Sequence, residues 1–98
     1  MTLVLSPELE AYVARRRAAL AAVRTVLLER LHLDLHPDAI QPDVPLFGTG
    51  LALDSVDALE LIVSLEHAFG RPLPTGRERR RMLRTVGTVV AWAVEDYP

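Results

Sequence analysis

Three prolines set the strongest constraint on what this chain can fold into. Pro37 disfavours helix at the residue before it, and Pro42 and Pro45 keep the following residues extended. On both sides of them, apolar residues recur at the spacing of an α-helix. We therefore expect two helices joined by a long ordered loop from Leu33 to Leu53, a length that is uncommon in small domains and typical of functional loops. Apolar side chains within the loop are expected to point inward and anchor it: Ile40, Val44, Leu46, Phe47 and Leu51.

The first helix is expected to run from about Pro7 to about Leu31. Ser6 is a good N-cap residue, and Pro7 suits the first helical position. Arg16 falls on the apolar stripe, where its stem is expected to lie along the edge of the core. The stripe itself comprises Leu9, Val13, Leu20, Val23, Leu27 and Leu31.

The second helix is expected to begin at Asp54 or Ser55 and to end at Phe69, with Gly70 as a left-handed C-cap. Its predicted inward face is Ala58, Leu61, Ile62, Leu65 and Phe69.

Two further helix starts follow. Thr75 and Glu78 form a capping-box pattern that opens a short third helix ending near Leu83. Thr85 is the predicted cap of a last helix. The inner stripe of that helix is expected to be Val86, Val89, Val90, Ala93 and Tyr97.

Length and composition support one helical domain. The 98 residues suffice for a single core, and the 50% hydrophobic content is mostly Leu, Val and Ala with few aromatics. We therefore expect an all-α fold, a small four-helix bundle spanning residues 1–98. The absence of cysteine excludes disulfides, thiolate catalysis and zinc–thiolate sites. With no signal peptide and no membrane-spanning run, a cytoplasmic protein without membrane insertion is expected.

Charge is unevenly distributed along the chain. Residues 29–66 carry eight acids against Arg30, a balance of −7, whereas residues 71–84 carry six arginines against Glu78, a balance of +5. Arginine clusters at 15–17 and 79–81 lack interleaved aromatics, and the whole chain is net acidic. Solvated or protein-binding faces are therefore favoured over nucleic-acid binding.

Ser55 opens the second helix directly after the glycine-punctuated segment 47–50. One interpretation is a helix cap, the ordinary role of serine at this place. The other is a modification site, because a helix N-terminus with free N–H groups suits a phosphate ester. A catalytic nucleophile is not expected, since none of the candidate bases His32, His36 and His67 neighbours the serine in sequence.

Apolar side chains follow Ser55 along one row of the second helix. Leu59 and Val63 lie one and two turns beyond it, next to Val56, Asp57 and Glu60. This pattern indicates either a docking surface or a helix with a wide buried stripe.

A metal site is not expected. His32 and His36 have the spacing of a helical metal-binding pair, but they straddle the predicted helix end before Pro37. A solvated helix terminus is the favoured interpretation.

The residues around Ser55 resemble the acyl carrier proteins of the phosphopantetheine-binding family. The likeness is carried by Ile40-Gln41-Pro42-Asp43-Val44-Pro45-Leu46-Phe47, by Gly50-Leu51 and by Leu53-Asp54-Ser55-Val56-Asp57-Ala58-Leu59-Glu60-Leu61. Glu66, Phe69-Gly70 and Thr85-Val86-Gly87-Thr88 fit the same pattern, so the resemblance covers nearly the whole chain.

This resemblance implies that Ser55 carries covalent 4′-phosphopantetheine, added from coenzyme A by a phosphopantetheinyl transferase. Asp54 matches the acid before the serine, which is expected to help the transferase hold magnesium and also to cap the helix. The face that partner enzymes contact is matched by Val56, Asp57, Leu59, Glu60 and Val63.

One region departs from the family. In the family the region of the third helix is usually acidic, whereas this chain has five arginines between residues 77 and 84. We expect Arg79 and Arg80 to contact dedicated partners, such as an acyl-loading enzyme or a ketosynthase of a specialised pathway.

The expected function is a monomeric, non-enzymatic acyl carrier of fatty-acid-like or polyketide-like biosynthesis. Asp-Ser rather than Gly-Gly-Ser at the attachment site favours an acyl carrier over the alternative, an aminoacyl or peptidyl carrier of a nonribosomal system. An unmodified helical adaptor, in which Ser55 is only a cap, is the second alternative.

Overall fold

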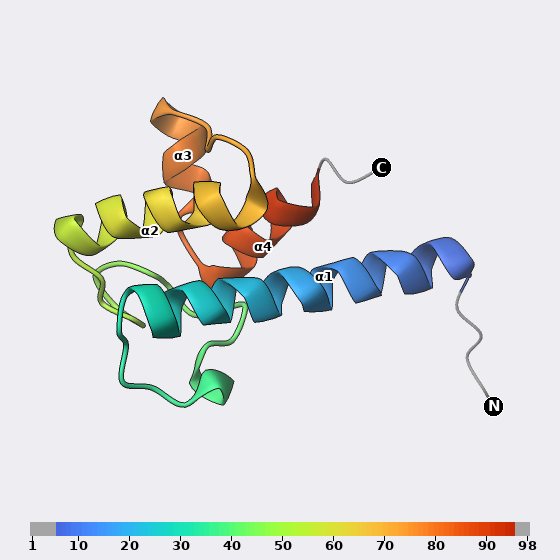
Figure 1. Cartoon of the computed structure of the whole chain (residues 1–98), viewed down its shortest axis with the longest axis horizontal. Coiled ribbons are helices and arrows are strands. Elements are labelled where there is room, and N and C mark those ends of the chain that lie inside the picture. The colour runs from blue at the N-terminus through green and yellow to red at the C-terminus, as the bar shows by residue number, and fades with distance from the viewer. Residues whose placement is uncertain (1–5, 96–98) are drawn as a thin grey trace.

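The structure, a computed structural model, describes residues 6–95 (Figure 1). These residues contain four α-helices and no strand, so the predicted all-α fold with a long first loop and a short third helix is confirmed. No helix in the described range is long and apolar enough to cross a bilayer. The elements are α1 (Pro7–Thr25), the π-helical turn η1 (Val26–Arg30), the 3₁₀ turn η2 (Pro37–Ala39), α2 (Ser55–Phe69), α3 (Gly76–Met82) and α4 (Val86–Glu95).

The first helix begins as predicted and ends in a wider turn. The Ser6 hydroxyl accepts a hydrogen bond from the Leu9 N–H at 3.1 Å. At the other end, the Leu31 N–H donates to the Val26 carbonyl at 3.3 Å, a π-helical bond. Val26 and Leu27 are both buried there. The wider turn brings successive apolar side chains to the core side, which a regular α-turn spreads further apart.

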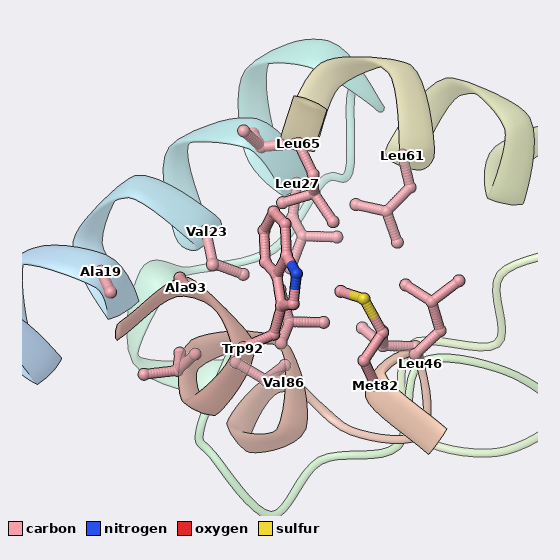
Figure 2. Close-up of a cluster of buried hydrophobic side chains, with 14 of the residues drawn as sticks. Ala19, Val23, Leu27, Leu46, Leu61, Leu65, Met82, Val86, Trp92 and Ala93 are labelled. Atoms are coloured by element: carbon pink, nitrogen blue, oxygen red, sulfur yellow. The ribbon is translucent and has the colours of Figure 1, made fainter. Parts of the chain in front are cut away.

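One core joins all four helices and the long loop. Figure 2 shows Trp92 of α4 among the clustered side chains, with Leu61 and Leu65 of α2 above it in this view. Met82 of α3 and Leu46 of the loop close another side. Most predicted inward residues are buried or half-buried as expected, and Trp92, which the sequence patterns did not assign to the core, is buried too.

The first half of α1 lies outside this core, contrary to the prediction for Leu9. Figure 1 shows this half, in blue, extending beyond the other helices, and Leu9 is 44% exposed. The apolar stripe continues past the end of the bundle, where no other described element covers it. Arg16 is half-buried, with its guanidinium 6.0 Å from the centre of the Tyr12 ring.

Backbone hydrogen bonds fasten the long loop to the start of α4. The Leu46 N–H donates to the Arg84 carbonyl at 3.1 Å, the Val86 N–H to the Val44 carbonyl at 3.0 Å, and the Gly87 N–H to the Pro42 carbonyl at 2.7 Å. The side chains of Ile40 and Leu46 are fully buried. The predicted inward anchors therefore hold the loop in place.

The end of the loop turns tightly before α2. Gly50 has a positive φ of 62°, and a Cβ built on it would lie 2.3 Å from the Pro45 carbonyl oxygen. The Leu51 N–H donates to that same carbonyl at 3.0 Å. This close backbone approach requires glycine at position 50.

The left-handed C-cap predicted at Gly70 is confirmed, with φ 66°, whereas the two remaining N-cap predictions have different outcomes. Thr75 occupies the N-cap position of α3, but its side chain makes no capping hydrogen bond, so the predicted capping box with Glu78 is wrong. Gly76, with φ 61°, turns the chain into this helix instead. The Thr85 cap of α4 is confirmed, because its hydroxyl accepts from the Thr88 N–H at 3.1 Å. Tyr97 lies outside the described residues.

Replacing Gly50 by alanine is expected to destabilise the fold far more than replacing Gly48. Gly48 also has a positive φ, 76°, but a Cβ there meets no atom within 4 Å. We expect Gly48→Ala to lower the free energy of unfolding by about 1 kcal/mol through backbone strain. Gly50→Ala should lower it by roughly 3 kcal/mol or more, because the loop must also move. Urea denaturation measures both, and equal losses would contradict the close approach described here.

Candidate functional site

Ser55 is the first residue of α2, and the residue before it caps the helix. The Asp54 carboxylate accepts the Asp57 N–H at 2.8 Å, and the Asp57 carboxylate accepts the Asp54 N–H at 3.0 Å. This reciprocal capping box takes the place that a serine cap would occupy. The interpretation of Ser55 as the helix cap is therefore wrong.

The Ser55 side chain is consequently free at the surface. It is exposed, and within residues 6–95 its hydroxyl makes no hydrogen bond. Within residues 6–95 none of the three histidines makes a hydrogen bond with this hydroxyl.

The start of α2 suits a phosphate ester on that hydroxyl. The N–H groups of Ser55 and Val56 have no intrahelical acceptor, because the first bond within the helix runs from the Ala58 N–H to the Asp54 carbonyl. The neighbouring carboxylates of Asp54 and Asp57 point at backbone N–H groups in the capping box. An added phosphate therefore meets donors and a favourable helix dipole.

Buried neighbours fix the position of this helix start. Leu53 is buried, and its N–H donates to the Leu46 carbonyl at 2.8 Å. Because Leu46 is itself bound to the start of α4, Ser55 stands two residues from a segment tied to the core. A partner protein thus meets the hydroxyl at a defined place on the surface.

The apolar row beyond Ser55 faces solvent. Val56, Leu59 and Val63 are 73%, 68% and 63% exposed, more than any other large hydrophobic side chain of residues 6–95. The alternative of a wide buried stripe is therefore wrong. Glu60 is exposed beside this row, whereas the Asp57 carboxylate is engaged in the cap. We call Val56, Leu59, Glu60 and Val63 the α2 face.

The arginines of α3 divide into one structural residue and three exposed ones. The Arg79 Nε donates to the Pro74 carbonyl at 2.7 Å, and this side chain is half-buried. Arg77, Arg80 and Arg81 are exposed. The structure thus places Arg80 where a partner can reach it and ties Arg79 to the preceding loop.

His32 and His36 do not share a helical face. His32 follows η1 with a positive φ of 55°, and the His36 Nδ1 accepts the Asp38 N–H at 3.1 Å at the start of η2. The helical segment ends at Arg30, before both histidines, so the prediction that they straddle the helix end is wrong. Within residues 6–95 no group of three or more metal-ligating side chains comes together.

Sequence reasoning missed the structural role of Asp57. It was assigned only to the partner face, yet its carboxylate closes the capping box. The Asp-x-x-Asp spacing at 54–57 was the available signal, because an acid at the third helical position can reach back to the cap.

Comparisons with known proteins agree with this geometry. The family described as "Phosphopantetheine attachment site" matches residues 21–77, more than half of the chain and inclusive of Ser55. An acyl carrier protein from Thermosynechococcus vestitus is 34% identical over 71 residues, which are 72% of this chain and 82% of that protein. No solved structure gives a significant match.

The family match covers the long loop and all of α2, and the fold has the four helices expected of such carriers. This chain belongs to the acyl carrier protein family, whose members carry covalently attached 4′-phosphopantetheine.

Proposed function

We propose that Ser55 is the residue that bears 4′-phosphopantetheine and that the chain, as one carrier domain, shuttles acyl groups in fatty-acid-like or polyketide-like biosynthesis. The observation that carries the proposal is the exposed Ser55 hydroxyl at the first position of α2, left free by the Asp54–Asp57 capping box. The Asp-Ser pair and the similarity to an acyl carrier protein support acyl cargo.

The attachment chemistry requires only an accessible hydroxyl from this chain. Ser55 Oγ forms a bond to the phosphorus of the phosphopantetheine unit as the pyrophosphate bond of coenzyme A breaks. Adenosine 3′,5′-bisphosphate leaves, and a base of the transferase takes the serine proton. The attached arm supplies a thiol that holds acyl groups as thioesters, which a chain without cysteine cannot provide itself.

The rest of the site keeps the encounter with each enzyme specific and brief. The α2 face offers three exposed apolar side chains and the Glu60 carboxylate next to the attachment point. Charge complementarity steers a partner to this face, and a small contact area lets it leave. Tethering the acyl group keeps it at high effective concentration during the encounter. The chain itself acts as carrier, not as catalyst.

Ser55→Ala is expected to abolish attachment of the arm. The chain contains three serines, and Ser6 is the matched control because it too is exposed at a helix start. After incubation with coenzyme A and a broad-specificity transferase, intact mass spectrometry should show one phosphopantetheinyl group on the wild type and on Ser6→Ala. The Ser55→Ala chain should gain nothing. A gain on Ser55→Ala equal to that of wild type would overturn the assignment.

Two variants of Asp54 separate its cap from its charge. Asparagine retains an oxygen that can accept the Asp57 N–H, whereas alanine does not. Asp54→Ala should lower the free energy of unfolding by about 1 kcal/mol and Asp54→Asn by much less. Both should slow arm attachment if the carboxylate helps to hold the magnesium ion of the transferase. Unchanged attachment kinetics in Asp54→Asn would limit this residue to capping.

The arginines of α3 give a matched pair for partner choice. Arg80 is exposed, whereas the Arg79 guanidinium is hydrogen-bonded to the Pro74 carbonyl. Arg80→Glu should lower kcat/KM for acyl loading by the cognate partner about tenfold through slower association, with unchanged stability. Arg79→Glu should in addition shift the urea midpoint. If Arg80→Glu is loaded with the same kcat/KM as the wild type, then α3 is not part of the surface that this partner contacts.

A further inference from the structure

We infer that the N-terminal part of α1 is a self-association surface that pairs antiparallel with the same segment of a second copy of this chain. The inference is independent of Ser55 and departs from the monomer expected from the sequence. The segment is residues 7–18, which we call the α1 extension; it projects from the bundle at the end opposite to the start of α2 (Figure 1).

The α1 extension exposes an apolar stripe that continues the core-facing side of the helix. Leu9 and Tyr12 are 44% and 40% exposed, and Val13 is half-buried. They lie on the same helical side as Val23 and Leu27, which are buried in the bundle. Arg16 lies within the stripe, where its stem adds apolar surface and its guanidinium stacks near Tyr12.

Charged residues flank this stripe in a self-complementary order. On one flank Glu8 is followed two turns later by Arg15, and on the other Glu10 is followed two turns later by Arg17. An antiparallel second copy places the acids of each helix opposite the arginines of the other on both flanks. A parallel copy places acids beside acids and arginines beside arginines.

In the part of the chain that the structure describes, the four flanking charges lack an ionic partner. Among residues 6–95, none of the four makes an ion pair, and Glu8, Glu10 and Arg17 are exposed. The Arg15 Nε is buried without a hydrogen-bond acceptor in that range, while its guanidinium lies 5.9 Å from the centre of the Tyr12 ring. The charge and exposure of Glu8, Glu10 and Arg17 therefore fit a second copy of the same helix. The Arg15 side chain lines a hollow beside Ala68 and Phe69, and its guanidinium must turn outward to join the pairing.

The small size of the surface leads us to expect a weak pair. Three to four turns of one helix bury less than a standard interface of about 1,600 Å², so the dimer is weak, with a dissociation constant on the order of 0.1 mM. Because each copy projects its α2 start away from the α1 extension, pairing leaves both Ser55 residues free (Figure 1).

Sedimentation equilibrium of the full chain up to millimolar concentration tests this inference. The wild type should dimerise, and high salt should weaken the dimer. Glu8→Arg with Glu10→Arg should weaken association about tenfold, because arginines then face arginines. Adding Arg15→Glu and Arg17→Glu should restore it. Glu29→Arg, which reverses an exposed charge outside the extension, is the control and should associate like wild type.

The restoring variant separates pairing from helix stability. Arginines at positions 8 and 10 oppose the helix dipole in both the double and the quadruple variant, so a loss caused only by weaker helix formation would persist in the quadruple variant. A wild type that stays monomeric, a double variant that associates like wild type, or a quadruple variant that fails to recover would each overturn the inference. If the wild type is a monomer, the apolar stripe of the α1 extension is not a contact between two copies of this chain, and a different protein becomes the candidate to cover it.

Discussion

The structure depends on the backbone pairing between the long loop and the start of α4. Three backbone hydrogen bonds hold this irregular segment against the core. They run from the Leu46 N–H to the Arg84 carbonyl, from Val86 to Val44 and from Gly87 to Pro42. They set Leu46 and Leu53 in the interior, and these two residues set the start of α2. Without this pairing, the loop would be too long and too rich in proline to hold any residue in place.

At the end of this loop, the carboxylates of Asp54 and Asp57 determine whether the Ser55 hydroxyl is free to react. Asp54 and Asp57 satisfy each other's backbone N–H groups, so Ser55 has no structural task at the helix start. The same arrangement leaves N–H groups and a positive dipole beside an exposed hydroxyl. Ser55 is therefore available for modification because Asp54, the residue before it, caps the helix in its place.

The sequence predicted most of the architecture because helix signals are local. Proline, glycine and apolar periodicity predicted the bounds of α2 and α3 closely, although the capping box predicted for α3 is wrong. Leu9 was misplaced because periodicity shows which side of a helix is apolar and not where the bundle ends. The π-helical η1 and the structural role of Arg79 depend on neighbouring elements, which no local pattern reveals. The position of Ser55 at a helix start left both a cap and a modification site open; the resemblance favoured modification, and the structure explains why Ser55 is not the cap.

The most direct test of the central claim is to locate the modification in the protein as its native host makes it. Tandem mass spectrometry of the purified chain should place 4′-phosphopantetheine on the peptide that contains Asp54 and Ser55, with fragment ions that assign it to the Ser55 oxygen. The peptides carrying Ser6 and Ser64, the remaining serines, should be unmodified. Phosphopantetheine on either of those serines, with Ser55 bare, would contradict the account.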